Sequence, residues 1–394
     1  MKRIAALLLA LWLAACGGGS QAPGGAGVLP KAWPASGPGE DPPPAPPVVE
    51  ALMGRLDLLP ALLPPAVATT LFDPLITGVT VRDLTDPALV AFTVRATLAQ
   101  LLGPKPAEIF HWYGHPDYNH SVAQVPVHFQ NRHGTSLYGE IVLPRRGQVP
   151  PSDGPFPAIL VLEGQNTNLA MYRWWHQLYA DAGYLVFAFD FSGQGHSEDE
   201  AEGDPGDNVH DAQDALDYLL ERSPVAGAVD RRRIGVVGHS MGAIASLGLQ
   251  AVEPRIHAAV AAAPISESSA PFDANPVPVM IQTGDHDGPV APIPAVNPAV
   301  VRPVYDKLQG DRAFIVADAS THAQHTNYAL LPTASWGLEL AGRYSLAWMD
   351  WHLRRDPAAL EILRSPHPHL SWLWDSEVRI GPDSVVMRGA GPLP

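Results

Sequence analysis

Ser240 lies between two glycines in the stretch "RIGVVGHSMGAIAS" (233–246), after an apolar run and before small residues. A serine at a sharp turn from a buried strand into a helix can act as a nucleophile, because backbone N–H groups at a helix start favour developing negative charge. Side chains at Gly238 and Gly242 would collide with the neighbouring strand and helix, which accounts for both glycines. The same pentapeptide also fits a plain turn with a capping serine, so other residues must decide.

Two later segments carry the groups that a serine nucleophile needs, which are a base and a carboxylate that orients it. "VMIQTGDHDGPVAP" runs from an apolar strand into Asp285 and Asp287, and "AFIVADASTHAQHTNY" runs into His322 and His325. The order serine, acid, histidine is one that parallel-sheet enzymes with such a triad follow. We therefore expect a triad, in which Asp287 competes with Asp285, nearer the strand end, and His322, directly after the small-residue turn, competes with His325.

Alternating strands and helices from about residue 122 onward must position these groups. Short apolar strands are predicted in "FPAILVLEG", "YLVFAFD", "RIGVVGHS", "HAAVAAAP", "VPVMIQTGD" and "RAFIVADAS", with helical segments between them and two strands joined by a turn in "VPVHFQNRHGTSLYGEIVLP". Strands that are buried on both faces and alternate with helices indicate an α/β fold, with a mostly parallel central sheet covered on both faces. The carboxyl edge of such a sheet is where ligands bind, so Ser240 and the acid and histidine segments are expected to meet there.

The stretch from about residue 122 to 355 resembles the α/β-hydrolase superfamily, and within it secreted bacterial serine esterases of the dienelactone-hydrolase and cutinase-like group, which includes polyester hydrolases. "GHSMG" resembles their nucleophile elbow, and "RWWHQLYADAGYLVFAFDFSGQGHS" resembles their paired tryptophans, helix and following turn. "GDHDGPV" points to Asp287 as the acid and "STHAQH" to His322 as the base. The resemblance implies an α/β-hydrolase fold and hydrolysis of carboxylic esters, small or polymeric, by Ser240, His322 and Asp287 without a cofactor.

An oxyanion hole is the further part that this chemistry requires. The backbone N–H of Met241, directly after the nucleophile, is one expected donor, and the loop "VLEGQNTN" supplies the other through Gln165. Glu163 in that loop is expected to be a structural carboxylate that local hydrogen bonds satisfy. Ile265, which follows "AAAP", is expected to line the substrate groove, whereas Trp174 and Trp175 are expected in the core.

The same residues are compatible with activities other than ester hydrolysis. An amidase, thioesterase or peptidase would use the same triad, and a non-catalytic binding lipoprotein could keep the scaffold, although an intact serine, aspartate and histidine set favours an enzyme. The formal net charge of −15 argues against nucleic-acid binding. "HWYGHPDYNH" (111–120) contains possible metal ligands, but its spacing fits no metal motif, so we expect no metal. The sequence does not indicate an oligomeric state.

The first residues are typical of an exported lipoprotein. "MKR" is followed by the apolar "IAALLLALWL" and by "LAAC", which resembles a bacterial lipobox with Cys16, the chain's single cysteine, as the lipidated residue. The predicted organisation is a signal peptide (1–15), a Gly/Pro-rich tether (16–47), a helical N-terminal extension packed on the core (48–120), the catalytic domain (121–363) and a C-terminal tail (364–394). This places the protein in the bacterial cell envelope, lipid-anchored to a membrane surface outside the cytoplasm.

Overall fold

A computed structural model describes residues 124–144, 154–165, 167–264, 277–285, 287, 298–318, 320, 322–326 and 337–389. The segments that we expect to be a signal peptide, a tether and an N-terminal extension lie outside the described residues, as do the histidines of 111–120. Cys16 and Ile265 also lie outside them, so their expected roles stay predictions.

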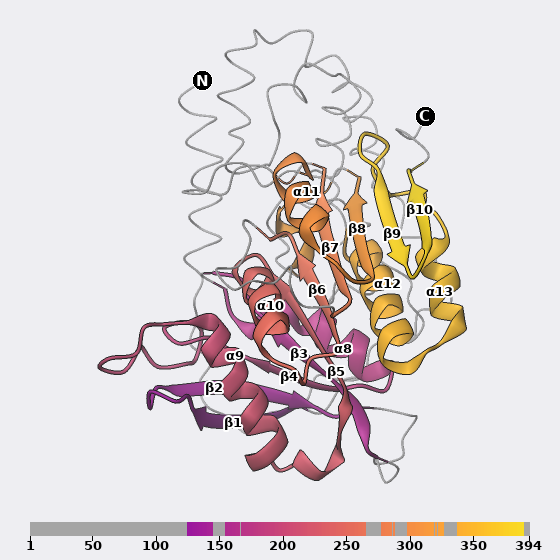
Figure 1. Ribbon diagram of the computed structural model, residues 1–394. Coiled ribbons are helices and arrows are strands. Elements are labelled where there is room, and N and C mark those ends of the chain that lie inside the picture. The colour runs from indigo at the N-terminus through magenta and orange to yellow at the C-terminus, as the bar shows by residue number, and fades with distance from the viewer. Residues whose placement is uncertain are drawn as a thin grey trace, which may run out of the picture.

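A ten-stranded sheet forms the centre of the molecule, in the order β1-β2-β4-β3-β5-β6-β7-β8-β9-β10 (Figure 1). The central strands from β4 to β8 pair in parallel, whereas β1, β2, β9 and β10 pair antiparallel at the two sides. The α/β class with a mostly parallel centre is therefore confirmed. The strands are β1 (Gln124–Gln130), β2 (Ser136–Val142), β3 (Phe156–Leu162), β4 (Leu185–Phe189), β5 (Val229–His239), β6 (Ala258–Ala262), β7 (Val279–Gly284), β8 (Arg312–Ala317), β9 (Ser376–Ile380) and β10 (Asp383–Met387).

Helices cover both faces of this sheet. One apolar core lies between the sheet and α8, α12 and α13, and a second lies between the sheet and α9, α10 and α11. Trp174 and Trp175 of α8 are 1% and 0% exposed in the first core, as expected. The α-helices are α8 (Arg173–Asp181), α9 (Asn208–Asp217), α10 (Met241–Val252), α11 (Pro298–Lys307), α12 (Gly337–Met349) and α13 (Pro357–Arg364). Shorter turns are the 3₁₀ segments η2 (Leu169–Tyr172), η4 (Ala226–Ala228) and η6 (His322–His325) and the π-helical segments η3 (Tyr218–Arg222) and η7 (Asp350–Arg354).

Local sequence signals set the ends of several helices. Asp207 caps α9 by accepting hydrogen bonds from the backbone N–H groups of Val209 and His210. After the end of α8, Gly183 adopts a φ of 85° and terminates the helical turn, because glycine enters the left-handed region without a steric penalty.

The C-terminal segment corrects one expected boundary. We expected residues 364–394 to be a tail outside the catalytic domain. Instead, β9 and β10 lie in this segment and continue the sheet beyond β8, so the domain extends past residue 363. The sequence "SEVRI" does not show the apolar pattern of a buried strand, because the carboxylate Glu377 occupies a buried position. Ion pairs with Arg302 and Arg379 compensate for its burial.

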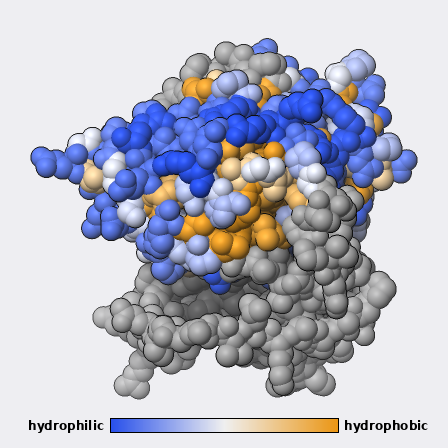
Figure 2. All heavy atoms as spheres, turned by 90° about the horizontal axis from the view of Figure 1, so that it is seen from below, coloured by the Kyte–Doolittle hydropathy of each residue, from blue (hydrophilic) through white to orange (hydrophobic). Residues whose placement is uncertain are grey.

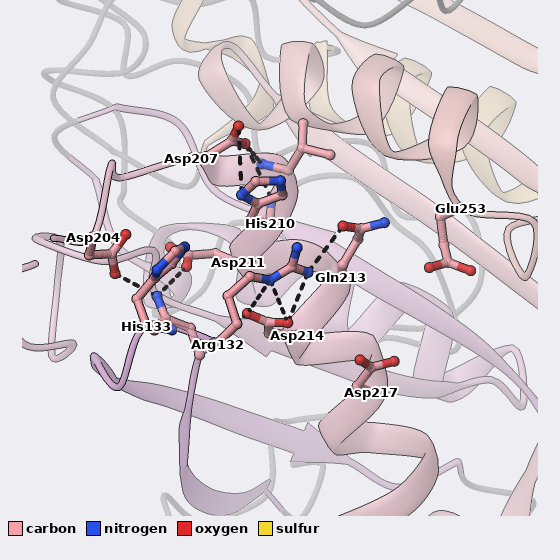
Figure 3. Close-up of polar contacts among 12 residues, drawn as sticks. Arg132, His133, Asp204, Asp207, His210, Asp211, Gln213, Asp214, Asp217 and Glu253 are labelled. Carbon is pink, nitrogen blue, oxygen red and sulfur yellow. Dashed lines mark hydrogen bonds and ion pairs between the residues drawn. The ribbon is translucent and has the colours of Figure 1, made fainter. Parts of the chain in front are cut away.

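The long segment between β4 and α9 is held against the turn between β1 and β2. The Asn131 side-chain amide donates to Asp204 at 2.7 Å and to Asp211 at 2.8 Å. Arg132 pairs with Asp214 at 3.0 Å in the same group of polar contacts (Figure 3). Donors from the first hairpin thus hold the segment after β4 through Asp204 and helix α9 through Asp211 and Asp214.

Figure 2 shows the molecule from below. Much of the described surface in this view is hydrophilic, and hydrophobic residues gather next to the hydrophilic area. Among the residues that the structure describes, none of the helices combines the length and the apolar character needed to cross a membrane.

Candidate active site

Ser240 sits at a sharp turn between β5 and α10. Its φ of 55° and ψ of −113° lie outside the regions that non-glycine residues prefer, and its backbone N–H donates to the carbonyl of Ala262 at 2.9 Å. Strain of this kind persists only where the surroundings impose it, and it is common at functional sites. The Ser240 side chain makes no capping hydrogen bond to α10, so the interpretation as a capping serine does not fit the geometry.

Gly238 and Gly242 are required by close backbone approaches. A Cβ at Gly238 would lie 2.1 Å from the carbonyl oxygen of Gly242. A Cβ at Gly242 would lie 2.4 Å from the carbonyl oxygens of both Leu162 and Glu163 at the end of β3. The two glycines therefore let the start of α10 pack directly on its neighbours, as the sequence predicted.

We expect Gly242→Ala to destabilise the protein by at least about 2 kcal/mol, because backbone atoms at 2.4 Å must move to admit a methyl group. Gly227→Ala is the matched control, since a Cβ there has no atom within 4 Å, and it should change stability by less than about 1 kcal/mol. Urea unfolding followed by circular dichroism measures both. Equal midpoints for the two variants would contradict the packing argument.

His322 and Asp287 are brought together from the loops after β8 and β7. Nδ1 of His322 lies 3.0 Å from Oδ1 of Asp287, which is 0% exposed, and the Thr283 hydroxyl donates to the other carboxylate oxygen at 3.3 Å. Burial raises the pKa of Asp287, and the facing His322 and Thr283 act in the opposite direction. A Cβ at Gly284 would lie 1.8 Å from the carbonyl oxygen of Ser320, so this glycine permits the two loops to touch.

The competing candidates have other partners. Asp285 accepts a hydrogen bond of 2.7 Å from the hydroxyl of Ser371, which comes from the C-terminal segment. His325 is fully buried, its ring stacks on Trp175 at a centroid distance of 6.1 Å, and burial lowers its pKa to about 3. The carboxylate that contacts His322 is therefore Asp287, and His325 is a buried neutral residue.

The loop after β3 lies beside the serine. A Cβ built at Gly164 would be 3.3 Å from the Cβ of Ser240, so no side chain separates the loop from the turn. Gln165, next in the chain, is exposed, and Met241 is partly buried at the first position of α10. Met241 thus adjoins Ser240 in the chain, and the loop that carries Gln165 adjoins it in space.

Glu163 is a buried structural carboxyl, as expected. Its Oε1 accepts from the backbone N–H of Phe191 and from the Gln194 side chain, both at 3.0 Å. Burial, reinforced by the nearby Asp190, raises the pKa of Glu163 well above its ordinary value. The carboxyl joins the loop after β3 to the turn after β4.

That turn, "DFSGQGHS", is wrapped around Asp190. The Asp190 carboxylate accepts from the backbone N–H groups of Leu169 and His196, each at 2.7 Å. Gly195 has a φ of 54°, and a Cβ there would lie 2.2 Å from Asp190 Oδ2, so the motif's second glycine is a steric requirement. Ser197 closes the turn by donating to the Asp190 carbonyl.

Within the described ranges, no three His, Cys, Asp or Glu side chains gather in an arrangement that could hold a metal ion. The groups that meet near Ser240 are an imidazole, a carboxylate and the start of a helix. These are the parts that nucleophilic acyl transfer requires.

Three residues near the site carry no signal of their role in the sequence. Tyr172 and His239 form a buried hydrogen bond of 2.9 Å beside Ser240, and Ser371 holds Asp285. The "GHSMG" motif predicts that His239 lies beside the nucleophile, but it does not predict the hydrogen bonds that His239 makes. Tyr172 ends the 3₁₀ turn η2 and Ser371 lies in an irregular stretch, and neither belongs to a motif that would mark it.

The mixed sheet with helices on both faces, and the strained serine between β5 and α10, define the class of α/β hydrolases. Within that class the chain belongs to the PETase family, described as PET hydrolase-like, whose model matches residues 101–371. The expected likeness to cutinase-like polyester hydrolases is thereby confirmed.

Individual relatives agree with this family. The chain is 28% identical over 225 residues to bis(hydroxyethyl) terephthalate hydrolase of Streptomyces coelicolor, covering 56% of this chain and 65% of that relative, which is just under two thirds of its length. It is 26% identical over 232 residues to cutinase est1 of Thermobifida alba, covering 57% of this chain and 70% of the relative. Cutinase 2 of Thermobifida cellulosilytica is 25% identical over 218 residues, covering 54% and 75%.

Proposed function

We propose that this protein hydrolyses carboxylic esters through an acyl-enzyme intermediate, with Ser240, His322 and Asp287 as the catalytic triad. The observation that carries the proposal is the 3.0 Å contact between Nδ1 of His322 and the buried carboxylate of Asp287. The backbone carbonyl of His322 also contacts His239, the residue before Ser240. Membership of the PET hydrolase-like family supports the same reaction.

The reaction follows from the roles of these groups. The Ser240 hydroxyl attacks the ester carbonyl while Nε2 of His322 takes its proton, and Asp287 fixes the imidazole tautomer and stabilises the imidazolium. The backbone N–H groups of Met241 and Gln165 stabilise the oxyanion, and removal of such a donor typically costs about 3 kcal/mol. His322 then protonates the leaving alcohol, and water releases the acid in a second round of the same steps.

The names of the relatives support a proposal about the substrate class. Their names specify cutinases and a hydrolase of bis(hydroxyethyl) terephthalate, so we propose aromatic diesters and polyesters among the substrates. Ser240 itself is 8% exposed, and Gln165 in the adjoining loop is solvent-exposed.

A labelling and hydrolysis experiment tests this function. We expect a fluorophosphonate probe to modify Ser240, as located by peptide mass spectrometry, because only an activated serine reacts. The protein should also hydrolyse nitrophenyl butyrate and bis(hydroxyethyl) terephthalate faster than the matched anilide and thioester. Absence of labelling would favour a non-catalytic binding protein, and preference for the anilide or the thioester would favour an amidase or a thioesterase.

We also propose that the protein is anchored in the cell envelope through lipidated Cys16. The support is the sequence "MKRIAALLLALWLAAC" with the chain's single cysteine at its end. Each acyl methylene buried in a bilayer contributes about 0.8 kcal/mol, so lipidation at this cysteine would hold the protein at a membrane.

Cys16→Ser is expected to shift the protein from the membrane fraction to the soluble fraction of the producing bacterium. Immunoblots of both fractions, with intact-mass analysis of the membrane-bound form, measure the change. An unchanged distribution, or an unmodified Cys16 in the wild-type protein, would refute the anchor.

A further inference from the structure

A largely buried chain of hydrogen bonds runs beside the site from the loop after β3 to the loop after β8. The backbone N–H of Gly164 donates to the hydroxyl oxygen of Tyr172 at 3.0 Å. The Tyr172 hydroxyl lies 2.9 Å from Nδ1 of His239, and Nε2 of His239 lies 2.9 Å from the backbone carbonyl oxygen of His322. We call the side chains of Tyr172 and His239, which form the middle of this series of hydrogen bonds, the Tyr172–His239 link.

The direction of each hydrogen bond is fixed by chemistry. The carbonyl of His322 can only accept, so Nε2 of His239 carries a proton and donates it. Burial and the neighbouring His322 and His325 hold the pKa of His239 well below its ordinary value, so the ring is neutral and its Nδ1 is an acceptor. The Tyr172 hydroxyl therefore donates to Nδ1 while it accepts from Gly164, and every member of the chain is satisfied.

The two ends of the chain belong to the two parts of the catalytic site that must be held relative to each other. Gly164 precedes Gln165, the proposed oxyanion donor, and approaches Ser240 closely. His322 is the proposed base, and its own backbone carbonyl is the terminal acceptor. His239 is covalently joined to Ser240, so the link fixes the donor loop and the base loop to the nucleophile's own strand.

We propose that Tyr172 and His239 are positioning residues, whose link holds the oxyanion loop and the base in register with Ser240. The inference rests on the proposed function, since it assigns a task within the same site. Misplacement of catalytic groups by about 1 Å can reduce turnover by roughly 100-fold, so a link between these loops has a direct effect on rate.

Packing around the link allows its polar role to be separated from its volume. The Tyr172 ring stacks on Trp175 at a centroid distance of 6.0 Å, and both side chains are 0% exposed. The His239 ring lies 4.7 Å from that of His322. Phenylalanine at position 172 would keep the stacked ring and remove only the hydroxyl. Gly164 N–H, His239 Nδ1 and the Thr167 hydroxyl would then lose this partner.

Tyr172→Phe is the first test, with Tyr344→Phe as the matched control. Tyr344 is also 0% exposed, and its hydroxyl also makes a hydrogen bond within the protein, to the carbonyl of Ser365 at 2.8 Å. We expect Tyr172→Phe to lower kcat for nitrophenyl butyrate by roughly 10- to 100-fold with KM within about twofold. Tyr344→Phe should keep the wild-type kcat at a similar melting temperature.

Two further readouts separate positioning from a merely structural role. The affinity for a boronic acid, which forms a tetrahedral adduct on the serine, should fall in Tyr172→Phe by about the same factor as kcat/KM, because both depend on the oxyanion donors. His239→Phe should lower kcat as well. The double variant with Tyr172→Phe and His239→Phe should be no slower than the slower single variant, because both residues act through the same series of hydrogen bonds.

The outcomes distinguish this inference from the proposed function. A Tyr172→Phe enzyme with kcat within about threefold of Tyr344→Phe, or additive losses in the double variant, would overturn the link. Unfolding of Tyr172→Phe where Tyr344→Phe stays folded would also overturn it, since the role would then be structural. If Ser240→Ala is inactive in the same assays, these results count against the link alone, whereas an active Ser240→Ala would instead refute the proposed function.

Discussion

Ser240→Ala is expected to fold normally and to lose ester hydrolysis by about 10⁴- to 10⁶-fold in kcat, because triad members act as a unit and the nucleophile has no substitute. Alanine removes a hydroxyl that makes no capping hydrogen bond, so no capping partner is lost. Alanine also keeps a Cβ at the strained backbone with its φ of 55°, so the steric restriction there is the same as for serine.

Ser246→Ala is the control for this variant. Ser246 lies on the same helix α10, is 0% exposed, and donates through its hydroxyl to the carbonyl of Gly242 at 2.8 Å. We expect its turnover to stay within a few-fold of the wild type. Steady-state hydrolysis of nitrophenyl butyrate, with active-site titration to exclude wild-type contamination, measures both variants. Activity of Ser240→Ala within about tenfold of wild type would refute Ser240 as the nucleophile.

Asp287→Asn is expected to lower kcat by about 10⁴-fold, because an asparagine facing Nδ1 favours the wrong imidazole tautomer and cannot stabilise the imidazolium. The 3.0 Å contact with His322 is the geometric basis for this loss. The Thr283 hydroxyl, which donates to the other oxygen of Asp287 at 3.3 Å, can still donate to the asparagine carbonyl. The fold is therefore expected to survive the change.

Asp285→Asn provides the matched comparison, two positions away in the same loop. Its side-chain oxygen can still accept from the Ser371 hydroxyl, which is 2.7 Å away in the wild type, so we expect kcat to fall by less than about tenfold. Parallel kcat measurements and thermal melts of the two variants check the assignment. A larger loss in Asp285→Asn than in Asp287→Asn would show that the wrong carboxylate has been chosen.

Most of the fold could be predicted because its signals are local. Short apolar runs define β3, β4, β6, β7 and β8. Asp207 and Gly183 mark helix ends through capping and backbone freedom, which depend only on neighbouring residues. β9 could not be predicted in the same way, because Glu377 breaks the apolar pattern and is tolerated only through arginines from α11 and from its own strand.

The class of fold, the elbow at Ser240 and the two strand ends that carry the acid and the histidine of the proposed triad could be predicted from the sequence. Each depends on short patterns: two glycines around a serine, an apolar run followed by carboxylates, and an apolar run followed by histidines. Tertiary structure alone decided which carboxylate meets His322, because Asp285 is held by Ser371, 86 positions along the chain. It also decided that Tyr172 meets His239, 67 positions away. Side-chain hydrogen bonds over such separations leave no periodic or spacing signal, since they form only after the packed sheet brings distant loops to one edge.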